Sequence, residues 1–247
     1  MSEWKFEGNL NDTSGHNNHG TAAGGVEYVA GVSGSAVRLA AGNPIVNDAA
    51  QGLPSGGADS WSINLWLRLA SAPTSLAYLA GFGPVNDTGA GTARGLIAYG
   101  GTQNNSVSVW GSNADTISST PYPLNRWAMV TITYDGADGT TSLYLDGQLI
   151  AQNVQRRVLI PDGEFHVSLA PTSYWHIDTA GDFDEFTIWS GVLGPSQISA
   201  LNNVARPKLD VKLAGTTLTL SWPAAATGFV LETTDDMGQG VWNVVQG

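Results

Sequence analysis

The sequence predicts a large all-β domain with one short helix. The 247 residues include 31 Gly and 9 Trp. Short runs of alternating apolar and polar residues recur between turns rich in Gly, Pro and Asn, whereas strongly periodic helical segments are almost absent. The chain is also long enough to bury a full hydrophobic core. These observations together favour β-strands packed in layers.

Three segments give the clearest strand patterns. The alternation of residues 61–69 predicts a strand whose core-facing side chains are Trp61, Ile63, Leu65, Leu67 and Leu69. Residues 126–134 predict a second long strand, and residues 142–150 predict a hairpin turning at Asp146-Gly147. We expect a short helix with Pro195 in its first turn and Ile198 and Leu201 facing the core.

The segment 181–189 (GDFDEFTIW) carries an unusual carboxylate. Because residues alternate sides along a strand, Asp184, Phe186 and Ile188 are predicted to share one face. An ionised Asp in line with two apolar residues is costly unless a cation or several N–H groups satisfy it. The sequence therefore places a special carboxylate at the rim of a core.

Charge and composition exclude several classes of function. The formal net charge is −11 and only 10 residues are Lys or Arg, which argues against nucleic acid as a partner. No apolar run is long enough for membrane insertion. With no Cys, a disulfide framework and a Cys-ligated zinc site are excluded. Because the first residues already look like a core strand, we expect the chain to be a piece of a longer exported protein.

The character of the chain changes near residue 206. Four short strands are predicted, at residues 209–213, 217–223, 228–232 and 241–244. They look like the opening half of a small β-sandwich, similar to fibronectin type III-like modules. We therefore expect a main domain over residues 1–205 and a partial module over residues 206–247. Either this tail docks on the main domain or the module's remaining strands have been cut away, and its small size favours the second alternative.

A family resemblance spans residues 3–203. It rests on Trp4-x-Phe6-x-Gly8, Asp12-x-Ser14-Gly15 and Gly31-Val32-Ser33-Gly34, followed by residues 63–67, 127–136, 143–147 and 182–186. In this order the motifs resemble the laminin G-like, or concanavalin A-like, lectin–glucanase superfamily. The resemblance implies a jelly-roll sandwich of two antiparallel sheets with a curved, more polar concave sheet. It also implies a domain appended to bacterial surface or polysaccharide-degrading proteins.

The resemblance further implies a structural calcium ion. Carried over by motif, its ligands are Asp12 and Asp184, with carbonyls near Asn17 or Asn18 completing the oxygen shell. In the alternative, Asp184 accepts N–H bonds from the loop at residues 9–20 and no metal is needed. Asp182 stands before the strand and is expected to be solvated.

Two groups of residues are candidates for a carbohydrate surface. Sugars stack on aromatic rings and need polar partners for their hydroxyl groups. Trp66 and Arg68 lie opposite the apolar row, on what should be the concave side, although Trp66 can equally pack under a covering loop. Tyr174-Trp175-His176 is the stronger candidate, since three ring side chains adjoin in a segment without strand alternation.

The sequence argues against an enzyme. Some jelly-roll glycosidases carry three acids alternating along one strand, but here Asp182 and Asp184 are followed by Phe186. We therefore expect a non-catalytic carbohydrate-binding or adhesion module of a larger secreted or surface-anchored bacterial protein, with a glycan or surface protein as partner. The alternative is a spacer or protein–protein interaction module without a sugar site, and a glycosidase is less favoured.

Overall fold

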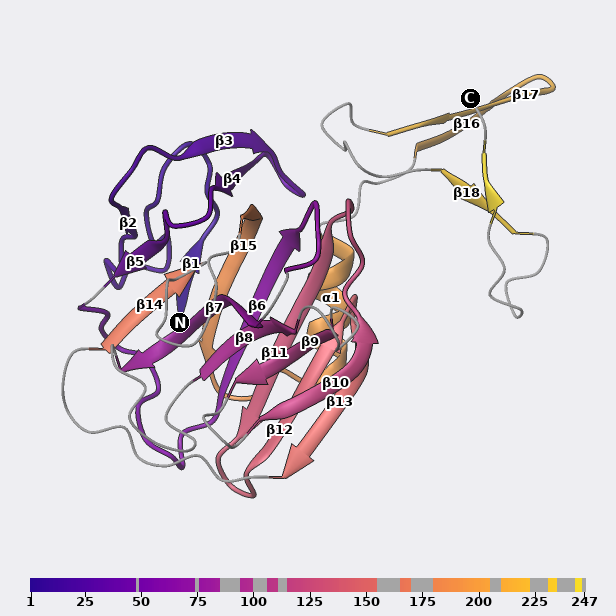
Figure 1. Cartoon of the computed structure of the whole chain (residues 1–247). Coiled ribbons are helices and arrows are strands. Elements are labelled where there is room, and N and C mark those ends of the chain that lie inside the picture. Colours follow the sequence, from indigo (N-terminus) through magenta and orange to yellow (C-terminus); the bar gives the residue numbers. More distant parts are fainter. Residues whose placement is uncertain are drawn as a thin grey trace.

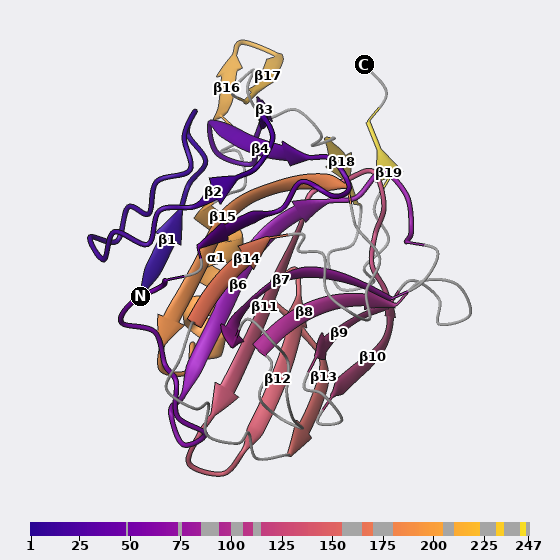
Figure 2. The ribbon, with the colours of Figure 1, turned by 60° about the vertical axis from the view of Figure 1, so that its left-hand side comes forward.

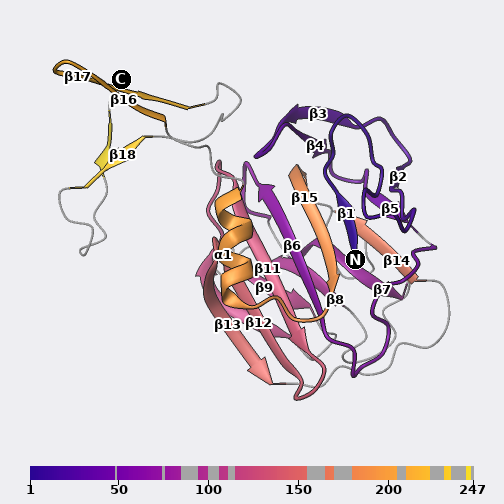
Figure 3. The ribbon, with the colours of Figure 1, turned by 180° about the vertical axis from the view of Figure 1, so that it is seen from behind.

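Two antiparallel sheets lie face to face in this protein, and one helix covers the outer face of the first sheet (Figures 1 and 3). The structure is a computed structural model that describes residues 1–47, 49–73, 76–84, 94–99, 106–110, 115–154, 165–169, 180–204, 210–222, 231–234 and 243–245. Within these residues, no helix is long and apolar enough to cross a membrane. The predicted all-β sandwich with a short helix is confirmed.

Among the described residues, the first sheet has eight strands and the second has seven. Figure 2 shows the two layers from the side. In spatial order the first contains β13 (Gln148–Val154), β12 (Thr140–Leu145), β11 (Ala128–Asp135), β6 (Trp61–Arg68), β15 (Gly181–Ser190), β4 (Ser35–Leu39) and β3 (Glu27–Ala30), and β1 (Ser2–Trp4) also pairs with β15. The second contains β10 (Thr116–Pro121), β9 (Ser106–Trp110), β8 (Arg94–Tyr99), β7 (Leu76–Pro84), β14 (Phe165–Leu169), β5 (Ile45–Asn47) and β2 (Thr21–Ala22).

The main core lies between the two sheets. The inward row predicted for residues 61–69 is confirmed, because Trp61, Ile63, Leu65, Leu67 and Leu69 all belong to this core. The second predicted strand is β11, which adds Val130, Ile132 and Tyr134. Burying this much apolar surface is the main contribution to folding.

The hairpin between β12 and β13 turns where the sequence predicts it. Asp146 and Gly147 have φ angles of 48° and 80°. Positive φ at both central residues is what a two-residue turn of this kind requires. The Asp146 carboxylate also accepts the backbone N–H of Met129 at 2.9 Å, which joins the turn to β11.

The helix α1 (Pro195–Val204) begins at Pro195 and packs on the outer face of the first sheet. Ile198 is fully buried and Leu201 packs beside it, as predicted. Together with Trp66 and Trp127 of the sheet, they form a second apolar cluster. The outer face of the first sheet is therefore covered rather than open along much of its length.

The alternation predicted along β15 is wrong at one point. The pairing of β15 with β6 shifts register between Asp184 and Thr187, and Glu185 has a φ angle of 49°. Such a bulge adds one residue to the strand. Every later side chain therefore points to the face opposite to the one that simple alternation predicts. Phe183 and Phe186 consequently both face the main core. Asp184 instead lies opposite Trp66 on the outer face, not on the face of Phe186 and Ile188.

The C-terminal strands pair among themselves. β16 (Asp210–Ala214) forms a two-stranded sheet with β17 (Thr217–Ser221), and β18 (Glu232–Thr233) forms another with β19 (Asn243–Val244). Val211 and Leu213 oppose Leu220 and Leu218, so this hairpin has an apolar face, much of it exposed. The likeness to a fibronectin type III module, and the boundary between residues 205 and 206, remain predictions.

Candidate functional site

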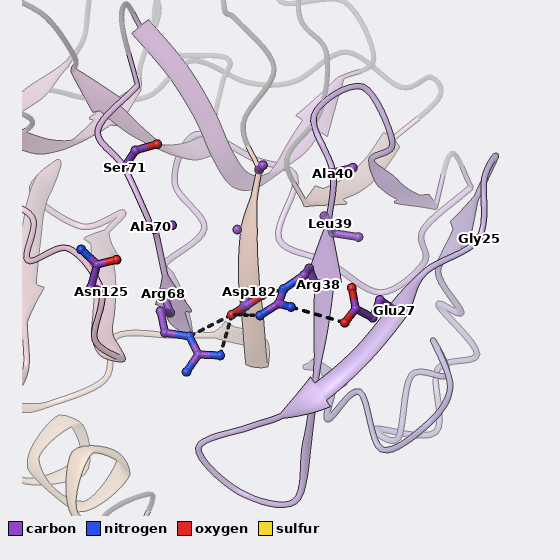
Figure 4. Close-up of a pocket in the computed structure, with 12 residues that line it drawn as sticks. Gly25, Glu27, Arg38, Leu39, Ala40, Arg68, Ala70, Ser71, Asn125 and Asp182 are labelled. Carbon is purple, nitrogen blue, oxygen red and sulfur yellow. Dashed lines mark hydrogen bonds and ion pairs between the residues drawn. The ribbon is translucent and has the colours of Figure 1, made fainter. Parts of the chain in front are cut away.

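A groove of about 610 Å³ opens at one end of the first sheet (Figure 4). It lies where β6 and β4 end and where β15 and β3 begin. Its polar lining comprises Glu27, Arg38, Arg68, Ser71, Asn125 and Asp182. The volume suits a small ligand or a few sugar rings.

Four charged side chains cross this groove as a ladder of alternating sign. The pairing registers place Glu27 opposite Arg38, Arg38 opposite Asp182, and Asp182 opposite Arg68. Each member comes from a different strand, in the spatial order β3, β4, β15 and β6. Opposite charges directly across neighbouring strands stabilise a sheet. We call these four residues the charge ladder.

Asp182 is the centre of the ladder. Its Oδ1 accepts Nε of Arg38 at 2.7 Å, and its Oδ2 accepts Nη2 of Arg38 at 3.2 Å. Nε and Nη2 of Arg68 lie 2.8 and 2.7 Å from Oδ2. The hydrogen bond with Asp182 raises the pKa of Arg38 above its already high ordinary value. The Asp182 side chain is only 8% exposed, so the expectation of a solvated carboxylate is wrong.

Of the two predicted residues on β6, only Arg68 reaches the groove. Its guanidinium lies over the Trp127 ring, 4.9 Å from the ring centre, in a cation–π contact. Trp66 shares the outer face but is only 3% exposed, because it packs in the cluster under α1. The expectation of an open concave surface at Trp66 is therefore wrong, and the alternative of a packed ring describes the structure.

Tyr174, Trp175 and His176 lie outside the described residues. They precede Ala180, which lines the groove, by only a few positions in the sequence. Their role in ligand binding stays a prediction.

Asp12 organises the loop that follows β1. Its Oδ1 accepts the N–H groups of Glu3 and Ser14, each at 2.9 Å, and its Oδ2 accepts the N–H of Asn18 at 3.0 Å. Burial raises the pKa of Asp12, but these hydrogen bonds outweigh it and the net pKa lies below the ordinary value. The carboxylate thus serves as a cap for loop N–H groups.

Both oxygens of Asn18 have partners within the protein. The side-chain Oδ1 accepts the N–H of Gln51 at 2.8 Å, and the backbone carbonyl accepts Nε1 of Trp4 at 2.9 Å. The side-chain amide donates to Ser2 and Gln51. Asn17, by contrast, is exposed and has a φ angle of 60°.

Asp184 is fully buried and clamps the turn between β3 and β4. Its Oδ2 accepts the N–H groups of Val32 at 2.8 Å and Ser33 at 3.3 Å, and its Oδ1 accepts the N–H of Glu185 at 2.9 Å. Burial raises its pKa to about 8, against the opposing effect of the Ser33 and Val32 hydrogen bonds. The alternative in which N–H groups satisfy Asp184 is right about the kind of donor. It placed these donors in the loop at residues 9–20, whereas Val32 and Ser33 lie in the turn between β3 and β4.

Gly31 permits this clamp. A Cβ atom at position 31 would lie 2.4 Å from Oδ2 of Asp184 and 2.8 Å from the backbone carbon of Ser35. Only glycine lets the carboxylate approach the turn so closely. The Gly31-x-x-Gly34 spacing, noted only as part of the family resemblance, is the feature of the sequence that could have indicated this contact.

The four residues predicted to hold calcium do not form an oxygen shell in this arrangement. The carboxylates of Asp12 and Asp184 accept N–H groups from two different segments. An N–H donor aimed at an oxygen carries the same sign of partial charge as a cation, and Ca²⁺ needs six to eight oxygen ligands. In the part of the chain that the structure describes, no three His, Asp or Glu side chains gather as metal ligands. Calcium therefore remains a prediction from family resemblance.

The sequence of residues 43–199 matches the family model of the concanavalin A-like lectin/glucanases superfamily. The chain belongs to this superfamily. No curated protein matches the chain.

Several solved structures share the fold. Domain 4 of AbnA, a GH43 extracellular arabinanase from Geobacillus stearothermophilus solved with arabinotriose, is 21% identical with a TM-score of 0.66, over 81% of this chain and 97% of that one. The binding domain of botulinum neurotoxin DC with SialylT is 16% identical with a TM-score of 0.61, over 83% and 51%. A Trypanosoma rangeli sialidase is 17% identical with a TM-score of 0.60, over 83% and 33%. The chain thus spans about half of the toxin chain and a third of the sialidase chain.

Proposed function

We propose that this chain is a non-catalytic carbohydrate-binding module whose site is the groove over the charge ladder. The observation that carries the proposal is the fixed row of charged groups along the groove, with the polar side chains of Ser71 and Asn125 beside it. Planar charged and amide groups are the partners that sugar hydroxyls need. Support comes from domain 4 of AbnA, which this chain covers almost completely and which was solved in complex with arabinotriose.

The state of the carboxylates supports a binding role rather than catalysis. A glycosidase places two carboxyl groups on either side of the scissile bond, one as acid and one as base or nucleophile. Asp182 is held by two guanidinium groups, and Asp184 is fully buried among backbone N–H groups. Phe186, at the third position of the acidic spacing, faces the main core. Neither Asp182 nor Asp184 is placed to exchange a proton with a bound sugar.

We place this module in a larger secreted or surface-anchored bacterial protein, as the family resemblance implies. In this proposal the C-terminal strands belong to a further β-sandwich module that follows the sugar-binding domain. The structural calcium that the resemblance also implies is left as a separate question, which chelation decides.

A second candidate is protein–protein adhesion. Another neighbour, a botulinum neurotoxin DC binding domain of which this chain spans about half, was solved with rat synaptotagmin II. The exposed apolar face of the β16–β17 hairpin is the feature of this chain that favours this candidate.

Glycan-array and affinity-gel screening of the full chain test the proposal. Ser71→Trp places a large ring in the groove and leaves the four residues of the charge ladder unsubstituted, and Ser199→Trp on the exposed side of α1 is its matched control. We expect specific glycan retention by the wild type and the control, and loss in the groove variant. Trp175→Ala is expected to weaken retention as well. Uniform silence from a folded protein supports the spacer or adhesion alternative, and release of product from a polysaccharide, lost on Asp182→Asn or Glu185→Gln, would establish an enzyme.

A further inference from the structure

We propose that the groove selects sugars that carry a carboxylate, of the uronic or sialic acid class, over neutral sugars. This inference rests on the proposed function, because it names the ligand class of that same groove. It follows from which hydrogen-bonding groups the charge ladder leaves free.

The buried carboxylate of the ladder has little capacity left for a ligand. A carboxylate offers about four lone-pair sites, two on each oxygen. Oδ2 of Asp182 receives one N–H contact from Arg38 and two from Arg68, and Oδ1 receives one from Arg38. A sugar hydroxyl in the groove therefore finds at most one acceptor site at the centre of the ladder, on Oδ1.

What remains at the centre are donors. Arg68 directs its Nε and Nη2 groups at Asp182, and no described residue accepts a hydrogen bond from its Nη1. Arg38 also directs Nε and Nη2 at Asp182, and its Nη1 contacts only Glu27 among the described residues. Two guanidinium groups on one buried carboxylate leave a local charge of +1. Charge-assisted bonds from guanidinium groups to a carboxylate are among the strongest polar contacts.

Glu27 is the group that a ligand carboxylate would replace. It contacts Nη1 of Arg38 at 3.3 Å, and its side chain is 63% exposed. An exposed pair of this kind is screened by solvent and contributes little to stability. Glu27 thus forms only a weak ion pair at Nη1 of Arg38, the position proposed for the ligand carboxylate. It therefore competes with that carboxylate for Arg38.

The arginine at the other end is already ordered. The Arg68 side chain is 23% exposed and is fixed between Asp182 and the Trp127 ring. A side chain that is held in place before binding loses less entropy when the ligand arrives. The rigid half of the site is therefore Arg68 with Asp182, and the exchangeable half is Arg38 with Glu27.

The test compares ligands that differ only in the carboxylate. Polygalacturonate and the same polymer fully methyl-esterified are run in affinity gels with the full chain, and sialyllactose is compared with lactose by calorimetry. We expect retention by the free acid at least roughly tenfold tighter than by its ester, the change for one lost charge-assisted bond. If the chain prefers sialyllactose to lactose but does not bind polygalacturonate, the result supports recognition of a ligand carboxylate and identifies the ligand as a sialic acid.

Variants locate the effect in the ladder. Glu27→Gln removes the competitor on an exposed side chain and is expected to tighten binding of the acid severalfold, whereas Arg38→Gln weakens it about tenfold. Asp210→Asn and Arg126→Gln make the same changes of charge at exposed residues that do not line the groove, and should leave binding unchanged. Melting curves confirm that each variant is folded.

Two results would overturn the preference for acidic sugars but remain consistent with the proposed sugar-binding function. One is equal retention by the free acid and its ester, and the other is binding of neutral glycans alone. Acid binding that neither Glu27→Gln nor Arg38→Gln alters would also overturn it, because the carboxylate would then bind elsewhere. Silence across acidic and neutral glycans alike would reject both the inference and the proposed function.

Discussion

Asp184 gives the chain an unusual dependence of stability on pH. A carboxyl group whose pKa is raised on folding binds its proton more tightly in the folded state than in the unfolded state. Its contribution is fully present below the unfolded pKa and is lost as the pH rises through the folded pKa. With an ordinary value of 3.8 and a folded pKa of about 8, Asp184 should destabilise the fold as the pH rises from 4 to 8.

The size of this effect follows from the same two values. At about 1.4 kcal/mol for each pH step, the interval from 3.8 to about 8 corresponds to roughly 6 kcal/mol. The folded pKa of about 8 already includes the opposing effect of the three N–H donors on the ionised form. Glu185 adds a slope of the same sign, since burial raises its pKa, opposed by Lys5 and aided by Glu3 and Glu7. The contribution of Asp184 must therefore be isolated by a variant.

Asp184→Asn provides that isolation. The amide nitrogen of Asn cannot accept an N–H bond, so one buried donor loses its acceptor at about 1–3 kcal/mol. Urea unfolding followed by tryptophan fluorescence gives the free energy of unfolding of both proteins at pH 5, 7 and 9. We expect the wild type to be more stable at pH 5, and the difference to shrink or reverse by pH 9. A difference that grows with pH would show that the N–H donors outweigh burial, which would refute the reasoning.

Three further predictions concern the turn, the first loop and the metal. Gly31→Ala should cost about 1–3 kcal/mol in urea unfolding, because its Cβ overlaps Asp184 and the backbone of the turn; wild-type stability would contradict the clamp. Asp12 has a lowered pKa, so its contribution is present above pH 4 and lost as the pH falls below that value; Asp12→Asn should therefore lose stability at pH 7 relative to wild type but much less at pH 3, and an equal loss at both would reject this role. Excess EDTA tests the structural calcium that the family resemblance implies, because removing a bound ion lowers stability; a drop in melting temperature that calcium reverses would support the ion, and an unchanged melting temperature would reject it and leave both carboxylates to their N–H donors.

Local patterns in the sequence predict much of this fold. The inward row of β6, the Asp146-Gly147 turn and the buried face of α1 each depend on residues close together in the chain. The bulge in β15 breaks such a pattern. Glu185 has a positive φ angle, and the residues after it face the side opposite to the predicted one. No residue type typical of a bulge, such as glycine, stands at this position to indicate it. Trp66 was misplaced for a different reason, since the helix that covers it lies more than a hundred residues away in the chain.

The candidate site was only partly predictable. Arg68 was predicted from its place opposite the apolar row, but the ladder depends on Asp182, which lies 114 positions from Arg68 and 144 positions from Arg38 in the sequence. Register between distant strands cannot be read from either strand alone. Burial of Asp182 follows from that pairing, which is why the sequence favoured a solvated carboxylate.

Glycan retention by Ser71→Trp, set against Ser199→Trp, tests the central claim most directly. If the groove over the charge ladder is the sugar site, wild type and Ser199→Trp retain the same glycans and Ser71→Trp retains none while melting normally. Unchanged retention by a folded Ser71→Trp would place any sugar site elsewhere on the molecule and contradict the account.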